Sequence, residues 1–124
     1  ALSRGAESAE LVEKDTKACG ALAANITTLK AERQARVHRG TAAKFLATRA
    51  GREPQWDIVF LDPPYAADEL GNLCTLLARG WLTPHAWVYL ETSRKYALPA
   101  MPAGWQLHRE REAGEVRYAL ARLV

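Results

Sequence analysis

The sequence predicts an α/β fold with a mostly parallel sheet, helices on both faces and an antiparallel hairpin at the C-terminal end. Strand-like and helix-like patterns alternate over most of the chain, which is typical of parallel strands joined by right-handed crossovers. The apolar run at residues 58–61 predicts a strand buried on both faces. After residue 104, apolar and polar residues alternate on either side of Ala113-Gly114, which predicts the hairpin.

The individual elements follow from caps and periodicity. Strands are expected at residues 9–13, 35–39, in the run that ends at Asp62, and at 86–91, with hairpin strands at 105–112 and 115–123. Asp15 is suited to cap the helix whose apolar stripe is Leu22, Ile26 and Leu29, and Thr41 is suited to cap the next. A third helix is expected over residues 68–79, followed by a connection at 81–85.

The composition is that of an ordinary globular protein of about one domain, with 48% hydrophobic and 25% charged residues in a chain of 124. No apolar run approaches the roughly 18 residues that span a bilayer, and no signal-peptide pattern is present, so a cytoplasmic protein with no membrane partner is expected. The net charge of +3 is compatible with a polyanionic partner. Cys19 and Cys74 belong to no cluster of ligands, so neither a metal site nor a disulfide is expected.

The strongest functional signal is Asp62-Pro63-Pro64-Tyr65, which directly follows the apolar strand. Prolines cannot donate ladder hydrogen bonds, so the strand ends there, where ligands bind in open α/β sheets. A carboxylate and the carbonyl of Pro63 could accept both hydrogens of an exocyclic base amine and turn its lone pair toward an electrophile. Tyr65 offers a ring for stacking on an unstacked base. The alternative is a strand-terminating Asp-Pro turn with an incidental tyrosine.

This tetrapeptide resembles motif IV, the (D/N)PP(Y/F) signature of S-adenosylmethionine-dependent amino-methyltransferases. Within that group the chain resembles the RsmD-type family of small-subunit (16S) rRNA guanine-N2 methyltransferases. The similarity covers nearly the whole chain and includes Leu11-Val12-Glu13-Lys14-Asp15, Asn25, Leu29-Lys30-Ala31, Ala35-Arg36-Val37, Phe45-Leu46, Gly80-Trp81-Leu82, Tyr89 to Glu91, Trp105-Gln106-Leu107-His108-Arg109-Glu110 and Ala113-Gly114.

The resemblance implies a Rossmann-like class I methyltransferase that uses S-adenosylmethionine and acts on ribosomal RNA or the small ribosomal subunit. It implies cofactor contacts from an acid for the ribose hydroxyls and from residues near adenine, in this sequence Glu13, Thr41, Ala42 and Asp62. It implies catalytic roles for Asp62, Pro63 and Tyr65, and substrate contacts from Pro64 and Tyr65. Arg109, Arg111 and Arg117 are candidates for RNA phosphates, although a solvated hairpin explains them equally well.

The family's glycine-rich cofactor turn is not found in the sequence, so a single methyltransferase domain lacking its first, central strand and part of its first helix is expected. Such a fragment should bind cofactor poorly and be inactive alone. Two other functions remain open. Motif IV also occurs in adenine-N6 DNA or RNA methyltransferases, and a non-catalytic α/β nucleotide- or RNA-binding domain would need no glycine-rich turn. The oligomeric state is not predicted.

Overall fold

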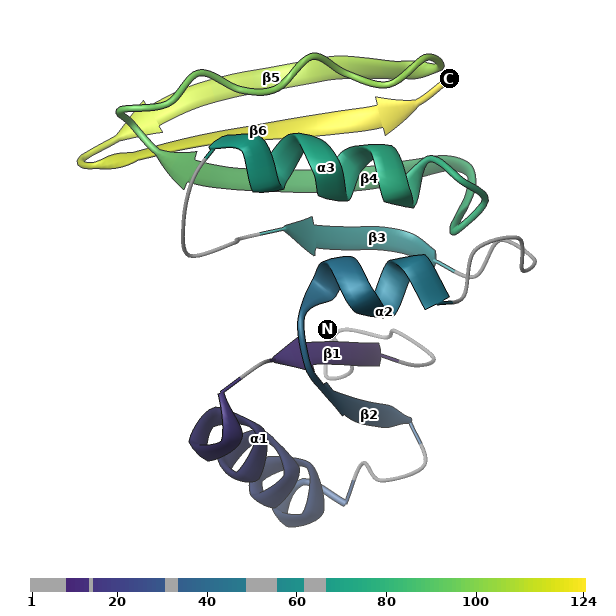
Figure 1. Ribbon diagram of the computed structural model, residues 1–124, viewed down its shortest axis with the longest axis vertical. Helices are drawn as coiled ribbons and strands as arrows, with labels where there is room; N and C mark the ends of the chain where they lie inside the picture. The colour runs from purple at the N-terminus through teal and green to yellow at the C-terminus, as the bar shows by residue number, and fades with distance from the viewer. Residues whose placement is uncertain (1–8, 14, 31–33, 49–55, 62–66) are drawn as a thin grey trace. The chain divides into compact units, whose positions relative to one another are not determined.

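The computed structural model describes residues 9–13, 15–30, 34–48, 56–61 and 67–124, which belong to two compact units, residues 1–45 and 46–124 (Figure 1). The first contains β1 (Ala9–Glu13), α1 (Thr16–Thr28) and β2 (Ala35–Arg39), and the boundary between the units falls within α2 (Ala42–Thr48). The second contains β3 (Trp56–Leu61), α3 (Ala67–Leu77), β4 (Leu82–Ser93), β5 (Trp105–Ala113) and β6 (Val116–Leu123). No described helix is both long and apolar enough to cross a membrane.

In the first unit, β1 and β2 form a parallel pair whose register runs from Ala9↔Ala35 to Glu13↔Arg39. Parallel neighbours need a crossover, which α1 supplies. The predicted cap is confirmed: the Asp15 Oδ2 accepts a hydrogen bond from the Ala18 N–H at 3.1 Å. The predicted apolar stripe is wrong at Leu29, which follows the last helical residue and is 76% exposed.

The second unit holds a four-stranded sheet in the order β3-β4-β6-β5. β3 and β4 are parallel, whereas β4–β6 and β5–β6 are antiparallel. The α/β class and the C-terminal hairpin are therefore confirmed, with Gly114 at φ 58° in the hairpin turn, where a residue without Cβ is favoured. Among the described strands, the pairs β1–β2 and β3–β4 are parallel, and the pairs β4–β6 and β5–β6 are antiparallel.

The core of the second unit lies between α3 and one face of the sheet. The apolar side of α3 is fully buried and so are the facing strand residues, among them Leu70, Leu73, Leu77, Val88, Leu90, Ala119 and Ala121. Cys74 lies in this core at 0% exposure, and burial raises the pKa of its thiol to about 11. At neutral pH Cys74 is therefore a neutral thiol that behaves as a small apolar side chain.

The prediction that the strand before Asp62 is buried on both faces is wrong. Leu61 is 7% exposed, but Ile58 and Phe60 are 59% and 70% exposed. Successive side chains of a strand point to opposite faces. An unbroken apolar run is therefore no proof of burial on both sides, and only the face that carries Leu61 belongs to the α3 core.

The predicted connection at residues 81–85 is also wrong beyond Trp81, because β4 already begins at Leu82. The β3–β4 register changes from Trp56↔Leu82 to Ile58↔Trp87, so extra residues of β4 are accommodated at an irregularity. Pro84 has no N–H to donate to the ladder, and an irregular position in a ladder tolerates a proline. His85 adopts φ 65° at the same place.

Candidate functional site

The predicted cofactor residues Glu13, Thr41 and Ala42 lie at or directly after the ends of β1 and β2, and in the second unit β3 ends at Leu61. Parallel strands present their carboxyl ends at one edge of a sheet, where α/β proteins bind ligands. We call the end of β1 and β2 the first edge, and the end of β3 and β4 the second edge. The two edges belong to different units and are described separately.

At the first edge, Glu13 is the last residue of β1 and is half-buried. Its Oε1 accepts a hydrogen bond from the Asp15 N–H at 3.1 Å. Its backbone carbonyl accepts from the Gly40 N–H at 2.9 Å and from the Cys19 thiol at 3.1 Å. Gly40 has φ 140°, which glycine adopts without strain. Side chain and backbone of Glu13 are thus both held in place.

Thr41 follows β2 and begins α2, as predicted. Its Oγ1 accepts from the Lys44 N–H at 3.3 Å, and its carbonyl accepts from the Phe45 N–H at 3.1 Å. The helix-capping role is therefore confirmed, whereas contact with adenine stays a prediction. Ala42, the first residue of α2, is half-buried and offers only its backbone and a methyl group.

The second edge is formed where β3 ends at the buried Leu61, which pairs with Leu90 of β4. The four residues that follow Leu61 in sequence, Asp62, Pro63, Pro64 and Tyr65, lie outside the described residues, so their roles stay predictions. On the neighbouring strand, Glu91 follows Leu90, and its Oε2 accepts a hydrogen bond from the Tyr89 hydroxyl at 3.2 Å. Glu91 was not predicted as a site residue, although it is an acid near the carboxyl end of β4.

The three arginines predicted to contact RNA differ in their surroundings. Arg117 on β6 is held between two carboxylates, 2.9 Å from Glu112 and 3.6 Å from Glu110. Arg109 and Arg111 on β5 are exposed, and neither makes an ion pair within the described part of the chain. Arg111 donates to the backbone carbonyl of Glu110 at 2.8 Å. Arg109 and Arg111 are therefore available to phosphates, while Arg117 would first have to leave its carboxylates.

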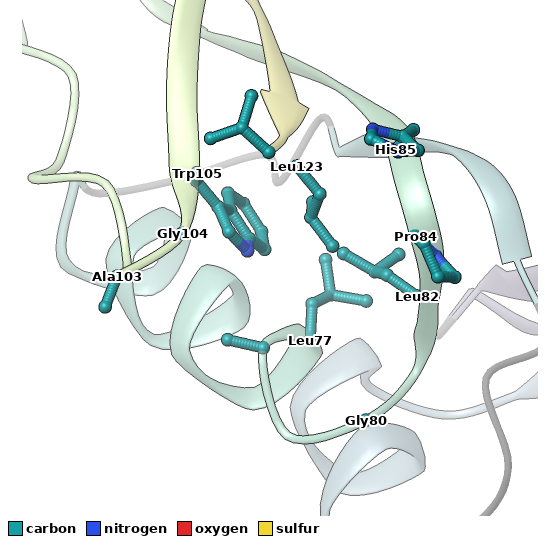
Figure 2. A pocket seen from close by; sticks show the side chains of 11 residues that line it. Leu77, Gly80, Leu82, Pro84, His85, Ala103, Gly104, Trp105 and Leu123 are labelled. Atoms are coloured by element: carbon teal, nitrogen blue, oxygen red, sulfur yellow. The ribbon is translucent and has the colours of Figure 1, made fainter.

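A cavity of about 390 Å³ lies in the second unit, at the amino end of β4 (Figure 2). It is lined largely by apolar side chains, including Leu77, Leu82, Trp105 and Leu123, with His85 at one side. None of the predicted site residues lines it. The described residues also contain no group of three or more His, Cys, Asp or Glu side chains able to hold a metal ion.

The Glu13 carboxylate at the first edge is an acceptor that suits the sugar hydroxyls of a nucleoside cofactor. A carboxylate can accept two hydrogen bonds from a vicinal diol, as in dinucleotide-binding folds. The Asp15 N–H occupies only part of the accepting capacity of the Glu13 carboxylate, which has about four lone-pair sites. A carboxylate that is fixed yet still able to accept is what such a diol requires.

Comparisons with known proteins identify relatives of this chain. The chain is 42% identical over 97% of its length to Ribosomal RNA small subunit methyltransferase D of Escherichia coli, and 35% identical over 97% to the protein of the same name from Haemophilus influenzae. The chain spans 59% and 62% of the length of these relatives.

Solved structures show the same similarity. A putative methyltransferase from Escherichia coli, yhhF, is 41% identical with a TM-score of 0.88, over 98% of this chain and 66% of that one. A putative methylase from Haemophilus influenzae is 33% identical with a TM-score of 0.90, over 99% of this chain and 76% of that one. These matches confirm the Rossmann-like class I methyltransferase fold. Since the family described as Conserved hypothetical protein 95 also matches residues 1–122, the chain belongs to this family, the RsmD type that its motifs resemble.

Proposed function

We propose that the protein containing this chain transfers a methyl group from S-adenosylmethionine to the exocyclic N2 amine of a guanine in small-subunit rRNA. The observation that carries this proposal is the 42% identity, over 97% of the chain, to Ribosomal RNA small subunit methyltransferase D. The motif Asp62-Pro63-Pro64-Tyr65, which follows β3 in sequence, supports the choice of an amine as the acceptor.

The first edge is the proposed cofactor site. Glu13 would accept hydrogen bonds from the ribose hydroxyls. The Asp15 N–H would keep its carboxylate in place, and the Gly40 N–H and the Cys19 thiol would fix its backbone carbonyl, so little reorganisation is needed. Thr41 and Ala42 would lie beside the adenine. When bound, S-adenosylmethionine supplies an electrophilic methyl group.

The motif Asp62-Pro63-Pro64-Tyr65 is the proposed catalytic site. The Asp62 carboxylate and the Pro63 carbonyl would accept the two amine hydrogens, which makes the nitrogen lone pair available for an in-line displacement. Asp62 would also border the cofactor, while Pro64 and Tyr65 would hold the flipped base by apolar contact and stacking. Positioning and amine polarisation would supply most of the rate enhancement, with no covalent enzyme intermediate.

Arg109 and Arg111 would contact RNA phosphates as a positioning term that is independent of sequence. The partner would be ribosomal RNA or the small subunit particle in the cytoplasm. We also propose that both units are parts of one methyltransferase domain, because single solved chains match 98% and 99% of the sequence.

The test is a methyl-transfer assay of the complete protein with radiolabelled S-adenosylmethionine on small-subunit particles, free 16S rRNA and duplex DNA, followed by nucleoside analysis. We expect N2-methylguanosine from an RNA substrate. N6-methyladenine as the product, or methylation of duplex DNA alone, would contradict the proposal. Absence of any methyl transfer would favour the non-catalytic binding domain.

A further inference from the structure

The charged residues of β5 are sorted to opposite faces of the β5–β6 hairpin. Two arginines and two acids alternate along the strand and pair with four successive residues of β6: Arg109↔Leu120, Glu110↔Ala119, Arg111↔Tyr118 and Glu112↔Arg117. Directly opposed residues of an antiparallel pair share one face of the sheet. Ala119 is 1% exposed in the core beneath α3. The two acids therefore lie on the α3 side, and the two arginines lie on the opposite face.

An irregularity in β5 causes this sorting. Leu107 pairs with Ala121, but the next pair is Arg109↔Leu120, so His108 is an extra residue on the strand. In a regular strand, side chains two residues apart share a face, and Arg109 would lie with Leu107 on the α3 side. The extra residue shifts the alternation by one position, as a β-bulge does when it re-aims a side chain. It therefore places the arginines away from α3.

The acids on the α3 side are neutralised by other residues of the second unit. Glu112 contacts Arg94 at 3.0 Å and Arg117 at 2.9 Å, and Glu110 lies 3.6 Å from Arg117. Two carboxylates and two guanidinium groups thus balance one another on this side. The arginines of β5 on the opposite face make no ion pair with any residue that the structure describes. Their charges are therefore available to an external anion.

Arg122 of β6 extends these arginines into a row. It is exposed, makes no ion pair within the described ranges, and pairs with Trp87 of β4 on the same face. Its guanidinium lies 4.9 Å from the centroid of the Trp87 ring. Arg109 and Arg122 are diagonal neighbours across β5–β6, about 7–8 Å apart, and Arg111 is about 7 Å further along β5. We call Arg111, Arg109 and Arg122 the arginine row.

We propose that the arginine row binds successive phosphates of one RNA strand, which adds Arg122 to the contacts named above and rests on the proposed function. Guanidinium groups bind phosphate through bidentate hydrogen bonds. Stacking on Trp87 orders the Arg122 guanidinium and leaves its N–H groups free to donate. Glu91 lies on the same face, but Tyr118 pairs with both Glu91 and Arg111 and therefore separates them. The row thus begins near the carboxyl end of β4 and leads along the hairpin.

The first experiment compares Arg122→Gln with Arg79→Gln in the complete protein by measuring the Kd for free 16S rRNA over a series of salt concentrations. Both changes remove one exposed positive charge, but Arg79 follows α3 and lies outside the row. We expect R122Q to raise the Kd about three- to tenfold and to reduce the slope of log K against log salt by about 0.7, the value for one phosphate contact on a single strand. R79Q should change the Kd less than twofold and leave the slope unchanged.

A charge-compensated variant separates the position of the charge from the net charge. Adding Asn72→Arg to Arg122→Gln restores the net charge at an exposed position of α3, which covers the other face of the sheet. We expect this double variant to bind RNA as weakly as R122Q alone. Recovery of the wild-type affinity would overturn the row, because net charge alone would then account for RNA binding. Equal effects of R122Q and R79Q would overturn it as well.

The methyl-transfer assay distinguishes failure of the row from failure of the proposed function. If the wild-type protein methylates guanine in RNA while R122Q binds RNA with the affinity and salt slope of the wild type, only the row is overturned. If the wild-type protein binds no RNA, the row and the proposed function are both overturned.

Discussion

The two strand-end edges are supported in different ways. At the first edge, Glu13 is fixed by hydrogen bonds to its near neighbours in sequence and to Gly40. The helix of that unit has no buried residue, and Ala35 is the one buried hydrophobic residue within the described part of residues 9–45. At the second edge, Leu61 and Leu90 belong to a core that includes much of α3. Thus one edge depends on local hydrogen bonds, and the other on packing between distant segments.

This difference predicts which changes damage stability and which damage function. A change in the apolar support of the second edge should unfold the protein. A change at the first edge should reduce cofactor binding while the fold persists. Variants of the two edges therefore test the comparison directly.

The largest loss of stability is expected for Leu90→Ala, because Leu90 is 0% exposed in the core beneath the second edge. Leucine-to-alanine changes at such sites cost about 2–5 kcal/mol. The matched change in the first unit, Leu29→Ala, alters a side chain that is 76% exposed and should cost less than about 0.5 kcal/mol. Urea unfolding of both variants gives the free energies of unfolding. Similar values for the two would show that the units do not differ in packing.

The largest loss of activity is expected for Asp62→Ala. Removing a preorganised acceptor should lower kcat about 10²-fold or more while the Kd for S-adenosylmethionine changes much less. Steady-state kinetics on the methylated RNA, with cofactor binding measured by calorimetry, separates the two effects. Activity within about tenfold of the wild type would remove Asp62 from the chemistry.

The sequence predicts features that depend on adjacent residues better than features that depend on distant ones. The bounds of β1 and β2 and the caps Asp15 and Thr41 are confirmed, because strand pattern and capping are set by a few adjacent residues. The exposure of Phe60 was missed, because an apolar run does not reveal what covers each face. The start of β4 was missed because Pro84 suggests a turn, whereas an irregular ladder accommodates it.

For the site, the motif Asp62 to Tyr65 was proposed from its residues and Glu13 from the family resemblance. Both roles stay predictions that rest on residue type, spacing and resemblance. Residue type and spacing could not show that Arg117 is held by Glu110 and Glu112, because that contact depends on the register of the β5–β6 hairpin. The position of Glu91 depends on register too: that it lies next to the end of β3 follows from the Leu61↔Leu90 pair. Cross-strand neighbours cannot be derived from the spacing along one strand.

A smaller effect is expected at the first edge from Glu13→Gln. The amide keeps the size of the side chain but loses the charge, so the Kd for S-adenosylmethionine should rise about tenfold, or about 1.4 kcal/mol. At saturating cofactor, kcat should stay within about threefold of the wild type, since Glu13 does not contact the reacting amine in this proposal. Glu115→Gln is the control for charge. A large loss of kcat with unchanged cofactor affinity would assign Glu13 to a different role.

The smallest effect is expected from changes at Asp15, which test whether its side chain only stabilises α1 or also contacts the cofactor. Asp15 caps α1 through its side chain, while its backbone N–H donates to the Glu13 carboxylate. Asp15→Ala removes the cap but keeps the N–H, so the free energy of unfolding should fall by about 1 kcal/mol with cofactor affinity within about threefold of the wild type. Asp15→Asn should preserve both, because asparagine caps equally well. If Asp15→Ala instead weakened cofactor binding as much as Glu13→Gln does, the Asp15 carboxylate itself would belong to the cofactor site, and local hydrogen bonding alone would not account for the first edge.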